Sequence, residues 1–240
     1  MKVRVAGNSH TGALWRAAEA DPESAEGFRV RPILNGSVEM EPFSHISEGQ
    51  VRLLHKEAQE RLKLGFDLSH FDQDAFWWFV VGNINARFLR DPLWEKVSVG
   101  GGPGREVSDA FFRAAVEDFL CQILTFFDQL KHCGVSFGVV FAPPPLEARW
   151  ADTKLGAARA LSHSVRAWKI YSELLDSRGI PFIRPPQEAF TSEGFLNPKL
   201  KSKRASDLIH GNEKYGRMMF DLIKQRSRSL DVAAVPGAAD

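Results

Sequence analysis

Apolar residues along the chain form two kinds of run, short stretches rich in β-branched and aromatic residues and longer stretches in which apolar residues recur at helical spacing. The short runs predict buried strands, because continuous apolar stretches of this length are typical of parallel sheets covered on both faces. The predicted strands cover residues 2–6, 28–34, 75–81, 135–141 and 180–183. The predicted helices start near Ser9 or Thr11 and then cover residues 47–64, 109–132, 154–177 and 213–225.

The alternation of strand and helix predicts an α/β protein, a three-layer α/β/α sandwich around a five-stranded parallel sheet. We expect the flavodoxin-like strand order, which places the carboxyl ends of the first and third strands where ligands bind. The third strand carries Trp77 and Trp78 at adjacent positions, so they should lie buried on opposite faces of the sheet. Residues 86–109, with Pro92 and a run of glycines, fit either a flexible connection or a flap over a site.

The length of 240 residues and the apolar fraction of 44% predict one domain over residues 1–228, followed by a flexible tail at 229–240. The formal net charge of +1 gives no electrostatic reason to expect nucleic acid or an anionic membrane as a partner. We expect no membrane span, and a strand that begins at residue 2 leaves no room for a signal peptide. These features predict a cytoplasmic protein in which Cys121 and Cys133 are buried free thiols. The oligomeric state stays open.

Ser9 stands in a strand, turn and helix at the start of the chain. Residues 2–6 form the strand, and Gly7 permits the sharp turn that ends it. A serine at this position is at the carboxyl end of a strand and beside a helix N-terminus, so it is suited either to capping the helix or to acting as a nucleophile. A nucleotide-binding interpretation is weaker, because Ala13 and Leu14 stand where a P-loop has Lys and Ser or Thr.

A serine nucleophile needs a base to accept its proton and a carboxylate to orient that base. Asp207 and His210, at the start of the last predicted helix, supply both groups at the sheet edge that carries Ser9. An oxyanion needs donors, and the N–H groups of Ser9 and Gly36 and the amide of Asn83 follow the first three strands. The alternatives are that Asp207 caps the last helix and that Gly36 and Asn83 simply make turns.

Taken together, these motifs resemble those of the SGNH/GDSL-type serine hydrolases, over residues 2 to about 225. Gly7-Asn8-Ser9-His10 resembles the first block of that family, with Asn8 where the family has Asp. Gly36 fits the second block, and Val81-Gly82-Asn83 approximates the third, which is usually Gly-x-Asn. Asp207-Leu208-Ile209-His210 matches the last block, Asp-x-x-His.

The resemblance implies the SGNH-hydrolase fold, with Ser9 as nucleophile, His210 as base and Asp207 as the acid that orients the base. It implies an oxyanion hole formed by Ser9, Gly36 and Asn83, and Asn85 competes with Asn83 for that role. We expect an esterase or deacylase that cleaves a carboxylic ester of a small molecule or carbohydrate, with no cofactor and no metal. The alternatives are an acyltransferase with the same triad and a non-catalytic binding protein that retains the fold.

A basic run lies just before the Asp-x-x-His motif. It consists of Lys199, Lys201, Lys203 and Arg204. Such a run is either a solvated loop or a contact for an anionic substrate.

Overall fold

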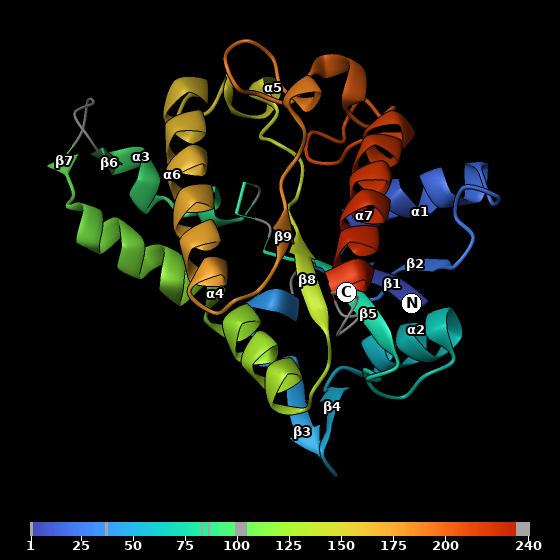
Figure 1. Ribbon diagram of the computed structural model, residues 1–240. Helices are drawn as coiled ribbons and strands as arrows, with labels where there is room; N and C mark the ends of the chain where they lie inside the picture. Colours follow the sequence, from blue (N-terminus) through green and yellow to red (C-terminus); the bar gives the residue numbers. More distant parts are fainter. Residues whose placement is uncertain (1, 37, 83, 86, 99–104, 234–240) are drawn as a thin grey trace, which may run out of the picture.

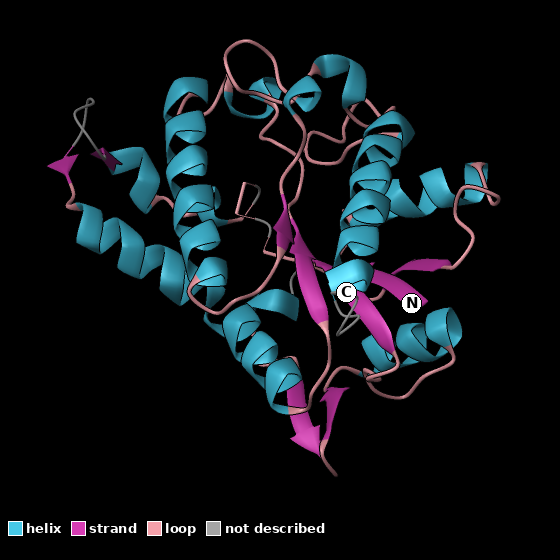
Figure 2. Ribbon diagram, viewed as in Figure 1, coloured by secondary structure: helices cyan, strands magenta, loops and turns pink. Residues whose placement is uncertain are grey.

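A five-stranded parallel sheet forms the centre of the computed structural model, which describes residues 2–36, 38–82, 84–85, 87–98 and 105–233 (Figures 1 and 2). The strands follow the order β2-β1-β5-β8-β9. Their bounds are Lys2–Gly7 for β1, Phe28–Pro32 for β2, Ala75–Val80 for β5, Phe137–Val140 for β8 and Phe182–Ile183 for β9. The predicted α/β class and flavodoxin-like order are therefore confirmed.

Helices cover both faces of this sheet (Figure 1). One face packs against α2 (Lys56–Phe66), α4 (Asp109–His132) and α6 (Ala157–Asp176), and the other against α1 (Thr11–Ala20) and α7 (Glu213–Ala233). Trp77 belongs to the first of these cores and Trp78 to the second, as alternation along a strand requires. Both side chains are 0% exposed, and both indole N–H groups donate hydrogen bonds, Trp77 to Asp72 and Trp78 to Ser227.

A hairpin replaces the first half of the helix predicted over residues 47–64. Strands β3 (Ser44–Ser47) and β4 (Gln50–Leu53) pair antiparallel, and only α2 from Lys56 onward is helical. The two turn residues, Glu48 and Gly49, both have positive φ, which is the conformation of a type I′ hairpin turn. Val51 and Leu53 are buried at alternate positions of β4, the spacing of a strand, whereas the predicted helix rested on Val51, Leu54 and Ala58 at helical spacing.

The segment predicted as a flexible connection or flap contains short ordered elements. They are η2 (Phe88–Arg90), α3 (Leu93–Lys96), β6 (Val97–Ser98) and β7 (Arg105–Glu106). Trp94 of α3 is 2% exposed and packs against Phe88 and against Phe112 of α4. This contact fixes the 88–98 part against the core, and residues 99–104 lie outside the described residues.

The last helix is longer than predicted. Helix α7 continues past Gln225 to Ala233, so residues 229–233 are helical where a tail was predicted, and residues 234–240 lie outside the described part. Four further short helical segments of the described chain were not predicted: η1 (Val38–Met40), α5 (Glu147–Trp150), η3 (Gln187–Ala189) and η4 (Pro198–Leu200). Cys133 is buried as expected, whereas Cys121 is exposed.

Among the described residues, no helix combines the length and apolarity needed to cross a bilayer.

His163 is a buried titratable group in the core beneath α3. Its side chain on α6 is 1% exposed and packs edge-on against Trp94 and Phe112. Neither ring nitrogen has a hydrogen-bond partner in the described part of the chain. Burial, with smaller contributions from Arg159 and Arg166, lowers the pKa of His163 from 6.5 to about 4.

The lowered pKa of His163 predicts a loss of stability in mild acid. Between about pH 6.5 and pH 4 the unfolded chain binds a proton that the folded chain does not, so the free energy of unfolding should fall as the pH falls. The expected loss from this group is about 2 kcal/mol between pH 7 and pH 5. Urea unfolding at the two pH values should show this loss in the wild type and a smaller one in His163→Leu. Equal losses in both proteins would contradict the prediction.

Candidate active site

The carboxyl ends of β1 and β5 approach each other closely at Gly7. A Cβ atom at this position would lie 2.2 Å from the carbonyl oxygen of Val80, and the φ of Gly7 is +152°. Only glycine fits this combination of contact and backbone angle. The next residue continues the contact, because Asn8 N–H donates to the same oxygen at 3.0 Å. Ser9 therefore starts from a turn that is held directly against the central strand.

Ser9, His210 and Asp207 form a continuous chain of hydrogen bonds. The Oγ of Ser9 lies 2.8 Å from Nε2 of His210, and Nδ1 of His210 lies 2.8 Å and 3.0 Å from the carboxylate oxygens of Asp207. A carboxylate only accepts hydrogen bonds, so Nδ1 carries a proton and Nε2 of the neutral ring accepts from the serine hydroxyl. Ser9 is exposed, whereas the His210 and Asp207 side chains are 23% and 21% exposed. This arrangement is able to move a proton from serine to histidine.

Asp207 is oriented by its own loop. One carboxylate oxygen accepts the N–H groups of Ile209 and His210, both at 3.2 Å. Burial by itself would raise the pKa of Asp207, but the hydrogen bonds from His210 and from Ile209 N–H outweigh it and hold that pKa below its usual value. Asp207 was expected at the start of the last helix, but the residue that caps α7 is Asn212, whose side chain accepts from Tyr215 N–H.

Ser9 does not cap α1. The N-cap position belongs to His10, whose side chain makes no capping bond. The ring of His10 instead packs against the ring of His210, with centroids 4.7 Å apart. The Oγ of Ser9 is thus left for His210, which argues against the capping interpretation of this serine.

The candidate oxyanion residues differ in what surrounds them. Gly36 follows a segment whose Ile33 and Leu34 N–H groups both donate to Gly7 O at 2.9 Å, which ties it to the serine turn. Asn83 lies outside the described residues. Asn85 is buried and donates its side-chain amide to Pro143 O at 2.7 Å, so the structure directs this amide toward the end of β8.

Comparison with solved structures gives the same architecture. A GDSL-like lipase from Bacteroides thetaiotaomicron VPI-5482 superposes with a TM-score of 0.51 at 14% identity, covering 95% of this chain and 88% of that chain. A proposed acylhydrolase from Bacteroides fragilis NCTC 9343 superposes with a TM-score of 0.51 at 13% identity, covering 95% and 86%. The chain has the SGNH/GDSL hydrolase fold. Neither a family model nor a curated protein matches the sequence at a significant level.

A buried carboxylate supports the serine turn of this SGNH/GDSL fold, and the sequence patterns did not reveal it. Glu39 is 2% exposed, accepts the side-chain amide of Asn8 at 2.7 Å and accepts Gly82 N–H at 3.1 Å. The side-chain oxygen of Asn8 accepts His10 N–H at 3.0 Å. Glu39 thus links the turn after β1 to the turn after β5. The substitution of Asn8 for the family's Asp supplies the amide N–H that a neighbouring carboxylate requires.

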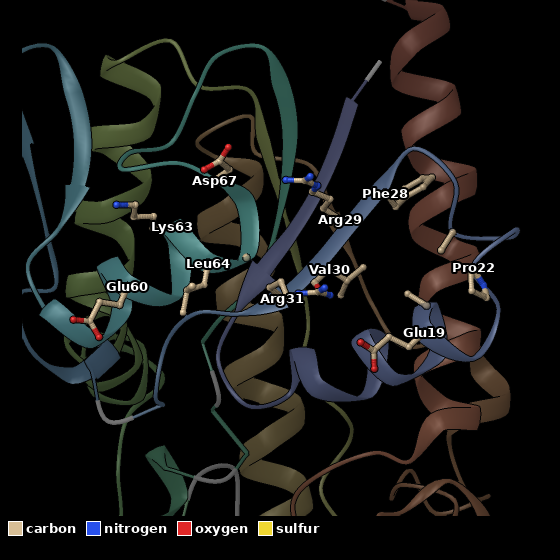
Figure 3. Close-up of a pocket in the computed structure, with 13 residues that line it drawn as sticks. Glu19, Pro22, Phe28, Arg29, Val30, Arg31, Glu60, Lys63, Leu64 and Asp67 are labelled. Carbon is tan, nitrogen blue, oxygen red and sulfur yellow. The ribbon is translucent and has the colours of Figure 1, made fainter.

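Ser9 and His210 open onto a cleft of about 430 Å³. A larger groove of about 1000 Å³ runs along β2 between α1 and α2 (Figure 3), but its lining holds neither a serine nor a histidine. The sheet edge in that groove is closed to a further strand, because Arg31 donates to Val30 O and Pro32 has no N–H. The smaller cleft is therefore the candidate active site.

The described residues contain no group of three or more His, Cys, Asp or Glu side chains arranged to hold a metal ion. The acidic and imidazole groups at the cleft are those of Asp207, His210 and Glu213. The first two bond to each other, which is the arrangement of an acid–base pair and not of metal ligands that share one centre.

Exchanging the amide and the carboxylate between positions 8 and 39 tests whether the two side chains stabilise the fold through their hydrogen bond. Asn8→Asp places two carboxylates in contact in a buried site, and we expect it to lower the free energy of unfolding by about 3 kcal/mol at pH 7. The loss should shrink as the pH falls, because a proton on either carboxyl restores a donor. The double variant Asn8→Asp/Glu39→Gln restores the same hydrogen bonds with the donor reversed and should recover most of the loss. Urea unfolding measures all three proteins.

Asn35→Asp provides the matched control. Asn35 also donates its amide to a glutamate, Glu57 at 3.2 Å, but this pair is exposed. Solvent screening should limit its cost to less than about 1 kcal/mol. If Asn8→Asp and Asn35→Asp cost the same, or if Glu39→Gln fails to rescue Asn8→Asp, Glu39 does not have the proposed bridging role.

Proposed function

We propose that this protein is a serine esterase or deacylase that cleaves a carboxylic ester of a small molecule or carbohydrate. The observation that carries the proposal is the chain of hydrogen bonds from Ser9 through His210 to Asp207, which opens onto a cleft at the carboxyl edge of the sheet. The solved structures that share the fold include one named as a GDSL-like lipase, which supports the same reaction class.

The proposed reaction has two steps. Ser9 Oγ attacks the acyl carbon while His210 Nε2 accepts the serine proton, and collapse of the tetrahedral intermediate breaks the ester C–O bond as His210 returns that proton to the leaving oxygen. Water then attacks the acyl-enzyme and gives a proton to His210; collapse of this intermediate breaks the acyl C–Oγ bond, His210 returns the proton to Ser9 Oγ, and the carboxylic acid leaves. Asp207 holds the imidazole in the required tautomer and stabilises the positive charge that forms on it.

The proposed oxyanion hole consists of Ser9 N–H, Gly36 N–H and the Asn83 amide. It is supported by the hydrogen bonds that tie the segment before Gly36 to Gly7 O, because they bring the ends of the first two strands together. The orientation of Asn85 toward Pro143 favours Asn83 over Asn85 for the third donor.

An acyltransferase would use the same residues and differ only in the acceptor. The exposure of Ser9 favours hydrolysis, because water reaches the acyl-enzyme from the open cleft. A non-catalytic binding protein would have no use for a serine hydroxyl bonded to a histidine that is itself oriented by a carboxylate. We therefore place hydrolysis first.

Covalent labelling tests the proposal without knowledge of the substrate. A fluorophosphonate probe should label Ser9, as mapped by peptide mass spectrometry, and Ser9→Ala and His210→Ala should abolish the labelling. Hydrolysis of para-nitrophenyl acetate should fall by about a thousandfold or more in both variants, and Asp207→Asn should lower it by at least about a hundredfold.

Ser192→Ala, which removes an exposed serine outside the cleft, is the control and should keep full labelling and turnover. A folded wild type that neither reacts with the probe nor hydrolyses the ester would favour the binding-protein alternative. Undiminished turnover in Ser9→Ala would refute the mechanism.

A further inference from the structure

Three basic side chains from two distant segments line the cleft that contains Ser9 and His210. Arg16 comes from α1, and Lys203 and Arg204 come from the loop before Asp207. The sequence singled out the loop residues as either a solvated run or a substrate contact. The structure adds Arg16 to the same cleft, which no spacing in the sequence indicates.

Within the described residues, these cations form no ion pair with an acidic side chain. None of the ion pairs in the described part of the chain includes Arg16, Lys203 or Arg204. The guanidinium of Arg16 bonds only to a carbonyl oxygen, Gly211 O at 3.4 Å. The cleft therefore gathers three cations that the overall net charge of +1 does not indicate.

Two acidic residues in the lining, Asp207 and Glu213, offset part of this charge and leave the cleft with a formal charge of +1. Asp207 is already bonded to His210 and to two backbone N–H groups, so its carboxylate is engaged by donors other than the three cations. Glu213 is the other acidic side chain in the lining. An anion that enters the cleft would meet several unpaired cations beside the reacting groups, and such a field raises both its local concentration and its affinity.

In the proposed reaction, the cleft is on the side of Ser9 where the leaving group departs. Its lining includes His210, which returns a proton to the leaving oxygen, and does not include Gly36, the candidate oxyanion donor. We propose that the substrate is an ester whose alcohol portion carries a negatively charged group, held by Arg16, Lys203 and Arg204. This inference rests on the proposed esterase function and specifies its substrate class.

Two pairs of esters test this proposal, each with one neutral member and one member that carries a carboxylate. The first pair is para-nitrophenyl acetate and an acetoxy-nitrobenzoate, which carries a carboxylate on the leaving phenol. The second pair is para-nitrophenyl hexanoate and the mono-para-nitrophenyl ester of adipic acid, which carries it on the acyl side. We expect kcat/KM to rise about tenfold or more for the leaving-group carboxylate, mainly through KM, and to show no such gain for the acyl-side carboxylate. Added salt should reduce the gain.

Single variants identify the residues. Arg16→Gln, Lys203→Gln and Arg204→Gln should each lower the ratio of kcat/KM between the charged and neutral acetates by about threefold, and the triple variant should remove the preference. Lys63→Gln, an exposed cation in the groove along β2, is the matched control and should leave the ratio unchanged.

The outcomes separate the two proposals. A wild type that hydrolyses none of the four esters overturns the proposed function, and the substrate class with it. A wild type that hydrolyses the neutral acetate without preferring the charged one overturns only the anionic substrate class. A gain of equal size for the acyl-side carboxylate, or a preference that survives in the triple variant, overturns the assignment to these three residues.

Discussion

The absence of a side chain at Gly7 is the constraint on which the site depends. It lets the end of β1 lie against the carbonyl group of Val80, at a distance that any Cβ atom would forbid. Gly7 O then accepts the N–H groups of Ile33 and Leu34, so the same residue also holds the segment after β2. Gly7 thus joins the ends of β1, β2 and β5, and Ser9 lies two residues after it. A displacement of this backbone would move the serine and the Gly36 segment together.

Glu39 adds a second connection between the same strand ends. A buried carboxylate is tolerated only where donors satisfy it, and here these include the Asn8 amide and Gly82 N–H. The Asp that usually precedes the serine in SGNH/GDSL motifs would face Glu39 as a like charge. Asn8 is therefore compatible with Glu39 at this position, where its amide donates to the carboxylate. A departure from the motif that weakens the sequence match is explained by a contact with a distant residue.

Much of the fold could be predicted from the sequence, because the features that indicate a helix or strand lie within that element itself. Residues 109–132 form the predicted helix, with Ser108 as its cap, because apolar spacing and a capping serine agree. The 44–53 hairpin was missed because Val51 and Leu54 continue the helical spacing of Ala58 in α2, while the hairpin depends on positive φ at Glu48 and Gly49. The positions of Ser9, Asp207 and His210 at the sheet edge were predictable, but the bond from Ser9 to His210 depends on how α7 and its preceding loop pack. Glu39 and Arg16 carried no signal, since a lone charged residue in a loop or on a helix usually faces water.

The loop over residues 201–212 connects the acid–base pair to the cationic side of the cleft. Its conformation is fixed by its own hydrogen bonds, from Ser202 N–H to His210 O and from Asn212 N–H to Leu200 O, both at 2.8 Å. The hydrogen bond from Ser202 N–H to His210 O closes a loop that contains Lys203 and Arg204. A charge bound at Lys203 and Arg204 therefore acts on the segment that positions the imidazole. The loop thus carries both the base and two of the three cleft cations, while the strand ends hold Ser9 from the other side.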